Sequence, residues 1–301
     1  MDIEPSGSAE YERERQLAEA AKDAGRLEEA LAHFSASIEA ARRTGDEDLV
    51  DRAVCNRAAV AIALGEAEDP VPRLCAILLR NRSQVSAFLA ANTIARACEL
   101  RRDHVKGVFY ARIALERAEA MGRTEWVAAS YNQIANLMLA DSEFEQAARG
   151  YHEALALVPG ADSPRQLAYL ANLGYCEVVL GRVRAGLAVL YRCLRTARRH
   201  GWQRLEMIAR IDLCYAHLEL GRFDHAQRHG TVGLRLAEDS GEIDWVKNAL
   251  YLLGEAAVLD GASTRAYAWF HELQRRFYPQ QRHLPDLLLS VDIRKLINLR
   301  A

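Results

Sequence analysis

The sequence has only seven prolines among 301 residues, and it contains no uninterrupted run of 18 apolar residues. Without such a run we expect no membrane-spanning helix, and the polar, acidic stretch from Met1 to Glu14 lacks the apolar core of a secretory signal. Alternating runs of β-branched residues, which would predict strands, are also missing. Ala, Leu, Arg and Glu are instead abundant, and this composition predicts helices throughout the chain.

Cysteine pairs of the C-x-x-C type are absent, and the six cysteines are scattered, at positions 55, 75, 98, 176, 193 and 214. Closely spaced pairs would predict a metal site or a redox centre. Scattered single cysteines are instead typical of reduced thiols in the core of a cytoplasmic protein. We therefore expect a cytoplasmic location and no cofactor.

Known catalytic motifs are missing as well. No phosphate-binding loop, nucleophile elbow or H-E-x-x-H zinc motif occurs. His225 and His229 lie four residues apart, a spacing that could place two metal ligands on one helix face, but no third ligand accompanies them. An exposed helix face is the simpler interpretation, so we predict neither catalytic activity nor a metal site.

Lysine is rare, with 4 residues against 35 arginines, a bias typical of GC-rich bacterial genomes. The formal net charge is only −2, with 25 acidic against 19 basic residues in 1–150 and 16 against 20 in 151–301. This weak asymmetry does not favour a nucleic-acid partner. The densest basic cluster, between Arg192 and Arg204, is interpreted as a solvated helix face.

The strongest positive signal is an internal repeat of about 40 residues. Leu180-Gly181-Arg182 is followed forty residues later by Leu220-Gly221-Arg222. Apolar residues recur at three- and four-residue spacing on both sides of each such step, which predicts two helices joined by a tight turn. The turn recurs along the whole chain, at Gly25, Gly65, Arg102, Ser142, Gly181, Gly221 and Gly261.

Two further positions keep their register in the repeat. Eight residues before each turn stands a large apolar residue, replaced by Arg57 in the second repeat, and the next residue is always Ala, Gly or Cys. Five residues after each turn the residue is again small, except for Pro70. Small residues at both positions would let the two helices of a pair cross at short distance.

This pattern resembles the tetratricopeptide repeat (TPR), with a large and small pair in the first helix, a small residue opening the second helix and an aromatic residue such as Phe34 or Tyr151 within it. The resemblance covers about nine-tenths of the chain, and repeats of 40 rather than 34 residues look like those of bacterial regulators and of kinesin light chain. It implies an all-α, right-handed α-solenoid of about seven helix pairs. The second repeat departs most, although Asp69 is predicted to cap the helix that Pro70 begins.

The domain boundaries follow from the repeat. Residues 1–9 are predicted to be a disordered tail, residues 10–279 the TPR-like array, and residues 280–301 a linker and a capping helix. A solenoid needs an element that covers its last hydrophobic edge. We expect that element to be a helix from Pro285 to Arg300. Its apolar stripe, which could instead join two copies of the chain in a homodimer, would consist of Leu289, Ile293, Leu296 and Ile297.

The resemblance also implies where a ligand would bind, because the first helix of each pair lines a concave groove in TPR arrays. Positions that would face this groove carry polar residues, namely Asn56, Asn92, Asn132, Asn172, Asp212 and Tyr251. Just beyond the large and small pair lie Arg96, Asn136, Tyr175, Tyr215 and Glu255. A carboxamide offers one acceptor and two donors, which match the N–H and C=O groups of an extended peptide. The alternative is that the asparagines bond to neighbouring repeats and fix their stacking.

We therefore expect a non-catalytic adaptor or sensor that binds a protein or peptide segment in the groove, with a regulatory role in a bacterium. The alternative is a structural scaffold subunit, held in a larger multiprotein assembly through the faces of the array. Nothing in the sequence predicts a nucleic-acid or membrane partner.

Overall fold

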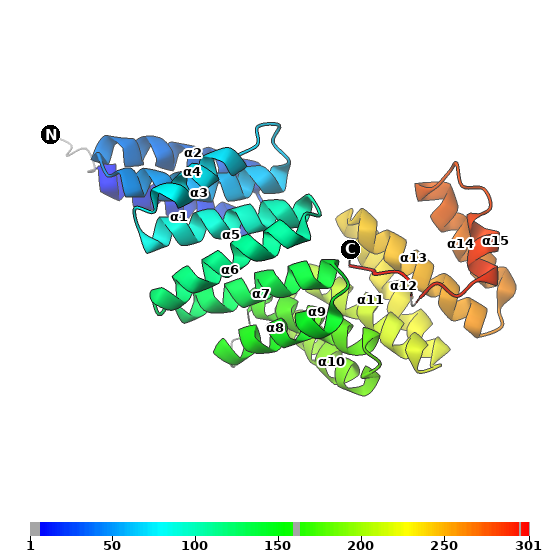
Figure 1. The fold of residues 1–301 in the computed structure, drawn as a ribbon. Coiled ribbons are helices and arrows are strands. Elements are labelled where there is room, and N and C mark those ends of the chain that lie inside the picture. The colour runs from blue at the N-terminus through cyan, green and yellow to red at the C-terminus, as the bar shows by residue number, and fades with distance from the viewer. Residues whose placement is uncertain (1–6, 159–162, 295, 301) are drawn as a thin grey trace. The chain divides into compact units, whose positions relative to one another are not determined.

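The computed structural model describes residues 7–158, 163–294 and 296–300, and within them the chain forms fifteen α-helices and no strand (Figure 1). The helices follow one another in the order predicted for seven pairs and a final short helix. The chain divides into two compact units, Met1–Leu137 and Met138–Ala301. The predicted all-α repeat array is confirmed.

The first unit contains six complete helices and most of a seventh. These are α1 (Gly7–Asp23), α2 (Leu27–Thr44), α3 (Glu47–Leu64), α4 (Val71–Arg80), α5 (Gln84–Leu100), α6 (His104–Ala120) and α7 (Thr124–Ala140). The second unit contains α8 (Phe144–Leu157), α9 (Pro164–Val179), α10 (Val183–His200), α11 (Gln203–Glu219), α12 (Phe223–Ser240), α13 (Ile243–Leu259), α14 (Ser263–Phe277) and α15 (Leu284–Ser290).

The turns within the helix pairs lie where the repeat predicts them. Five of the seven predicted turn residues are glycines with φ between 66° and 78°. The other two are Arg102, with φ 57°, and Ser142, with φ 63°. These two residues adopt the left-handed conformation although a side chain makes it less favourable. The turn register is thus confirmed even in the repeats that lack a glycine.

Small residues allow the helices of a pair to approach closely, as predicted. A Cβ atom added at Gly254 on α13 would lie 2.2 Å from Cε1 of Phe270 on α14. One added at Gly174 on α9 would lie 2.7 Å from Cδ2 of Leu190 on α10. The large side chain of the second helix therefore fills the space that the missing side chain leaves.

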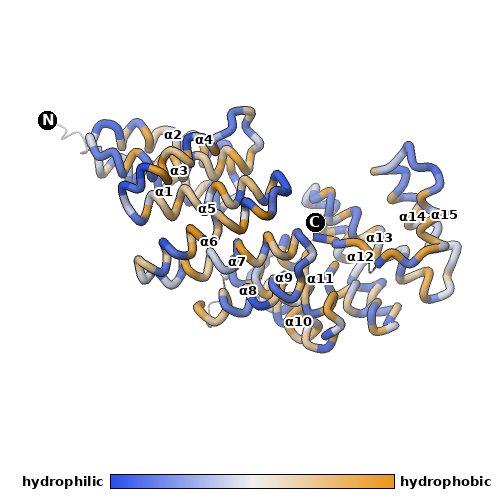
Figure 2. The backbone as a smooth tube through the Cα atoms, viewed as in Figure 1, coloured by the Kyte–Doolittle hydropathy of each residue, from blue (hydrophilic) through white to orange (hydrophobic). Residues whose placement is uncertain are grey.

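The hydrophobic core lies between the helices, and Figure 2 shows hydrophobic and hydrophilic residues alternating along them. The aromatic residues predicted for the second helix of a pair are buried, among them Phe34, Tyr151 and Phe270. No helix in the described part of the chain is long and apolar enough to cross a membrane.

The irregular second repeat keeps its fold through polar contacts. Arg57, which replaces an apolar residue, donates to Ser35 Oγ at 3.1 Å and to Glu66 Oε2 at 3.0 Å. Asp69 Oδ1 accepts the backbone N–H of Val71 at 3.0 Å, but α4 begins at Val71 and its N-cap is Pro70, so the predicted cap and the predicted first helical residue each lie one residue too early. α4 is also short, with only ten residues.

The N-terminal boundary differs slightly from the prediction. α1 begins at Gly7, so residues 7–9 are helical rather than disordered. The remainder of the predicted tail, residues 1–6, lies outside the described residues.

The capping helix is shorter than predicted. α15 packs on α14 and buries Pro285 and Leu288, but it ends at Ser290 because Val291 is extended, with φ −132° and ψ 121°. The prediction of a helix as far as Arg300 is therefore wrong. Residues 291–294 and 296–300, which we call the return segment, run back from α15 across α13 (Figure 1). The predicted apolar stripe does not form, since the segment's polar side chains bind other helices of the second unit.

Candidate ligand-binding groove

The first helices of three successive pairs in the second unit bring six predicted site residues together. α11 lies between α9 and α13 and contacts both. The rings of Tyr175 on α9 and Tyr215 on α11 have centroids 6.2 Å apart. All six residues are buried except Asn172, which is half-buried and has polar contacts of its own. The six are Asn172, Tyr175, Asp212, Tyr215, Tyr251 and Glu255.

Arg294 of the return segment binds acidic residues of α11 and α13. Its Nη1 donates to Glu219 Oε1 at 3.1 Å, and its Nε lies 3.6 Å from Glu255 Oε2. Within the segment itself, Nη2 donates to Asp292 Oδ2 at 2.6 Å. The side chain of Arg294 is buried to about the same degree as that of Glu219. Charged groups buried in this way need such partners, because each has lost its hydration.

Arg300 binds at the other end of the surface that α9, α11 and α13 present to the return segment, which we call the groove. Its Nη2 donates to Asp212 Oδ2 at 2.5 Å. Its guanidinium carbon lies 4.4 Å from the ring centroid of Trp245 and 5.0 Å from that of Tyr175. A planar guanidinium can pair with a carboxylate and interact with aromatic faces at the same time, which an ammonium does less well.

Asn298 lies between the two arginines and is bound through both ends of its carboxamide. Its Nδ2 donates to the backbone oxygen of Leu139 at 2.6 Å and lies 3.2 Å from Ser142 Oγ. Its Oδ1 accepts from Tyr175 Oη at 3.3 Å. These contacts reach from the end of α7 to α9.

The groove also binds the main chain of the return segment. The N–H of Leu299 donates to Tyr175 Oη at 3.1 Å, and its carbonyl oxygen accepts from Asn248 Nδ2 at 2.8 Å. An asparagine on the first helix of a pair therefore bonds to the main chain of a segment outside the repeats. The residue that does so, Asn248, is not among the predicted ones.

Burial gives this groove an acidic interior that is costly to leave unpaired. It raises the pKa of Asp212 to about 6, and the nearby Arg300 opposes that rise. It also raises the pKa of Glu255 to about 7, with Asp292 adding to the rise and Arg294 opposing it. A cationic side chain that pairs with these carboxylates favours their charged form. The groove is thus chemically matched to guanidinium groups.

The predicted site residues of the first unit lie in a different environment. Asn56 on α3, Asn92 on α5 and Asn132 on α7 are half-buried, and Arg96 is exposed. Asn136 is half-buried and has polar contacts. Among the described residues Asn56 and Asn92 have no hydrogen-bond partner, and the Oδ1 atom of Asn132 is buried without one. These three amides therefore make no hydrogen bond to a neighbouring repeat among the described residues.

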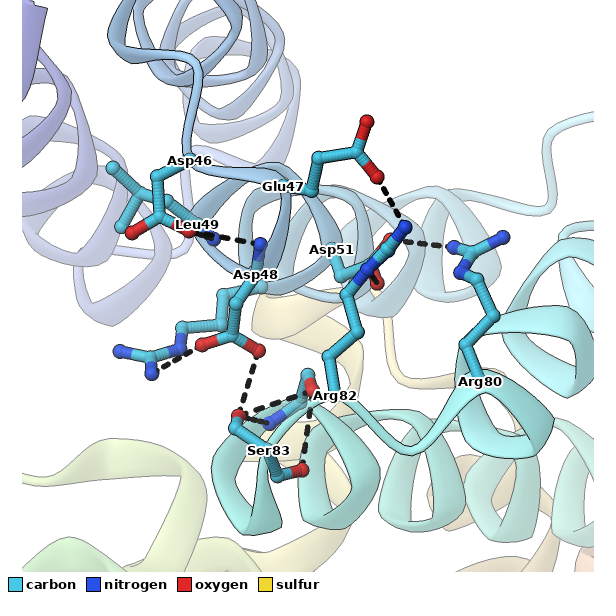
Figure 3. Close-up of polar contacts among 10 residues, drawn as sticks. Asp46, Glu47, Asp48, Leu49, Asp51, Arg80, Arg82 and Ser83 are labelled. Atoms are coloured by element: carbon cyan, nitrogen blue, oxygen red, sulfur yellow. Dashed lines mark hydrogen bonds and ion pairs between the residues drawn. The ribbon is translucent and has the colours of Figure 1, made fainter.

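The polar contacts of the first unit gather instead at the loop between α4 and α5 (Figure 3). Arg80 Nη2 donates to Asp51 Oδ1 at 2.6 Å, and Ser83 Oγ donates to Asp48 Oδ1 at 2.6 Å. The first contact joins the two helices of the second pair, and the second joins the start of α5 to α3 in the preceding pair. We assign the second contact to the stacking of the repeats.

The two histidines considered as metal ligands differ in exposure. His225 is exposed, whereas His229 is half-buried, with Nε2 3.4 Å from Tyr191 Oη. Tyr191 Oη also lies 2.7 Å from Nε2 of the buried His217. Among the described residues no group of three or more His, Cys, Asp or Glu side chains could hold a metal ion.

The sequence predicts Tyr175, Asp212 and Glu255 at this site but not the return segment that they bind, because its residues fit the pattern of a capping helix. It also does not predict Glu219, Trp245 and Asn248, which bind the segment from α11 and α13. Arg294, Asn298 and Arg300 lie beyond the last repeat and do not share its pattern. One signal was available: Asp212 and Glu255 are acidic residues at inward-facing positions, and a buried carboxylate requires a partner.

Comparison with known proteins supports the fold. No family model and no curated protein matches the sequence. The apo form of RapI has a similar structure, with a TM-score of 0.67 at 12% identity over 88% of this chain and 98% of RapI. A Rap protein complexed with competence and sporulation factor has a TM-score of 0.62 at 15% identity, over 98% of this chain and 76% of the Rap protein.

A third similar structure is a STAND signal-transduction ATPase with a tetratricopeptide repeat sensor, from Pyrococcus horikoshii. It has a TM-score of 0.64 at 14% identity and covers 91% of this chain, which matches 44% of the ATPase. At these identities the likeness shows the fold alone. The chain is a TPR-like helical repeat protein, as the repeat pattern predicts.

Proposed function

We propose that this chain is a non-catalytic binding protein that recognises an extended protein or peptide segment in the groove formed by α9, α11 and α13. The observation that carries the proposal is the bound return segment, whose side chains and main chain are held by side chains of the repeats. A surface that binds one non-helical segment in this manner has the donors and acceptors to bind another.

A regulatory role as adaptor or sensor in a bacterium is part of the proposal. The similar Rap protein is complexed with competence and sporulation factor, which makes ligand binding by such an array a reasonable model. Binding would act by population shift, because a ligand that prefers one arrangement of the helices stabilises it. The predicted cytoplasmic location agrees with this role.

Selection of peptides from a random decapeptide display library tests the proposal directly. The full chain is compared with the variant Asn172→Ala, and with Arg184→Ala as a control, since Arg184 is exposed on the second helix of the α9 and α10 pair. We expect peptides selected on the wild type to bind the control and to bind Asn172→Ala at least about tenfold more weakly, the loss of about 1.4 kcal/mol. Equal binding to the two variants would contradict groove recognition.

The scaffold alternative has one observation in its favour. Val105 and Phe109, four residues apart on α6, are 82% and 60% exposed. Large exposed apolar side chains are typical of contact surfaces. Sedimentation of the full chain over a range of concentrations tests this reading and the predicted homodimer. Growth of mass that Val105→Ser abolishes favours assembly, and a monomer at all concentrations excludes both.

A further inference from the structure

The return segment is held mainly by polar recognition rather than by burial of apolar surface. Leu296 is 79% exposed and Val291 is 43% exposed. By contrast, α15 buries Pro285 and Leu288 and so belongs to the hydrophobic core. The side chains that anchor the segment are Arg294, Asn298 and Arg300.

The anchors form a simple pattern of two arginines six residues apart with an asparagine between them. Arg294 meets the carboxylates of Glu219 and Glu255, and Arg300 meets that of Asp212. Opposite charges therefore meet at both ends of the groove. The spacing of the two arginines thus matches the spacing of the carboxylates, as it would in a peptide ligand of the groove.

We propose that the return segment is an intramolecular ligand, which occupies the groove until an arginine-bearing segment of a partner displaces it. The incoming segment would place one guanidinium on Asp212, between Trp245 and Tyr175, and another on the acidic pair Glu219 and Glu255. This inference rests on the proposed function and specifies its ligand class. It also makes the groove self-inhibited, since partner and return segment compete for the same carboxylates.

Displacement is physically reasonable because the intramolecular fit is incomplete. The Nε atom of Arg300 is buried without a hydrogen-bond partner, and such an atom lowers the net gain from binding. On the other side, tethering gives the segment an effective concentration in the millimolar range. A partner must therefore bind the free groove well to compete, and removing the tethered anchors should raise its apparent affinity.

The test uses the full chain and a fluorescein-labelled peptide with the sequence of residues 291–300, VDIRKLINLR. The anchor variant is Arg294→Ala combined with Arg300→Ala. Two controls keep the anchors: Arg282→Ala, at an exposed arginine before α15, and Leu296→Ala, at an exposed position within the segment. Binding is measured by fluorescence anisotropy, and circular dichroism checks that each variant is folded.

We expect the peptide to bind the anchor variant at least about tenfold more tightly than the wild type and both controls, because the tethered competitor is lost. A peptide in which both arginines are replaced by alanine should bind none of the proteins. If the double variant does not fold, Asn298→Ala serves in its place, since it keeps both ion pairs and removes only the central anchor.

A second readout follows the return segment itself. In protein labelled with 5-fluorotryptophan, the ¹⁹F signal of Trp245, assigned with Trp245→Phe, reports the guanidinium of Arg300 that lies over the ring. We expect Arg300→Ala to shift this signal. Excess peptide added to the wild type should leave it near its original position, because one arginine replaces another.

The outcomes separate this inference from the proposed function. Equal peptide affinity for the wild type and the anchor variant would overturn intramolecular occupancy and leave the proposed function standing. If VDIRKLINLR binds neither protein while library peptides bind the groove, the arginine preference is wrong. If no peptide of any sequence binds either protein, both proposals fail.

Discussion

The two units differ in the residues that they carry at the positions predicted to face a groove. In the first unit these positions are mostly asparagines, half-buried, and Asn56 and Asn92 have no partner among the described residues. In the second unit they include Tyr175, Asp212 and Glu255, which are buried and lie against the return segment. A half-buried amide can hydrogen-bond to water when no ligand is present, at little cost in free energy. A buried carboxylate has lost its hydration and needs a cationic or hydrogen-bonding partner.

The ion pairs of the two units show the same contrast. Asp51 pairs with Arg80 of a helix in the same repeat, 29 residues along the chain. Asp212 pairs with Arg300, which lies 88 residues away on a segment outside any helix. The geometry of the two contacts is similar, at 2.6 and 2.5 Å. They differ in whether the arginine is fixed by its own secondary structure.

The largest effect is expected where a helix pair of the second unit has no room for a side chain. Gly254→Ala places a Cβ 2.2 Å from the Phe270 ring, so we expect a loss of about 2–3 kcal/mol in the free energy of unfolding despite the better helix propensity of alanine. Urea unfolding measures it. In the first unit the equivalent position already carries Ala95, and Ala95→Gly should cost only about 1 kcal/mol. An unchanged free energy of unfolding in Gly254→Ala would show that α13 and α14 have room for the added methyl group.

Acid should remove a stabilising contribution that two buried histidines make to the second unit. Burial lowers the pKa of His217 and of His229 to about 4, and the buried Nδ1 atoms of both lack an acceptor for a new proton. The unfolded chain then binds more protons between pH 6.5 and 4, so this contribution is complete above pH 6.5 and is lost as the pH falls towards 4. In the first unit, a hydrogen bond from His33 lowers the pKa of Glu14, whose contribution is lost only below the ordinary glutamate range.

Hydrogen exchange at pH 7.5 and pH 5 measures this difference. In the wild type the raised pKa values of Asp212 and Glu255 act in the opposite direction, since these carboxyls take up protons in the folded state first. We therefore compare variants: relative to pH 7.5, the protection of α11 and α12 at pH 5 should be about 2 kcal/mol higher in His217→Gln than in the wild type, while amides of α1 and α2 should not respond to the substitution. The exposed His225→Gln serves as control and should behave as the wild type. An unchanged pH dependence in His217→Gln would contradict the assignment to the buried histidine.

The two ion pairs should respond differently to loss of the arginine. Arg80→Ala leaves Asp51 buried beside a rigid helix, and we expect a cost of about 2 kcal/mol in unfolding free energy. Arg300→Ala should cost about 1 kcal/mol or less, because the return segment can leave and water can reach Asp212. Differential scanning calorimetry of both variants measures the two losses in unfolding free energy. A larger cost for Arg300→Ala would mean that the segment is an integral part of the fold.

Much of the fold could be predicted because the repeat is local. Three kinds of residue recur at a fixed spacing: the turn residues, the small residues at the helix crossings and the aromatic residues of the second helices. The helix boundaries assigned in one repeat can therefore be checked against those of the others. Arg102 and Ser142 were placed correctly by register alone, although neither residue favours a left-handed turn. The predicted length of the capping helix was wrong because the apolar residues after Ser290 also fit a helical stripe. These residues lie beyond the last repeat, so no equivalent positions in other repeats could be compared with them.

The groove positions could be predicted only as a set of candidates. Register places Tyr175 and Asp212 on inward-facing helices, but register contains no information about a segment 88 to 124 residues further along the chain. The return segment is bound through ion pairs and hydrogen bonds between residues far apart in the sequence. Such contacts do not recur with the period of the repeat, so the repeat pattern does not predict them. Asn248 illustrates the limit, since it binds a main-chain carbonyl from a position that the amide series does not include.

The smallest predicted effect compares the two turns without glycine. Arg102→Gly should stabilise the first unit by about 0.5–1 kcal/mol, because glycine adopts φ 57° without the steric cost of a Cβ and this gain exceeds its entropy loss. Ser142→Gly makes the same change in the second unit at φ 63°, but it removes the hydroxyl that lies 3.2 Å from Asn298 Nδ2. Its net gain should be smaller by a few tenths of a kcal/mol, and it should help the VDIRKLINLR peptide to compete. Thermal unfolding and peptide anisotropy on the two variants measure both effects; equal gains with unchanged peptide binding would remove Ser142 from the groove.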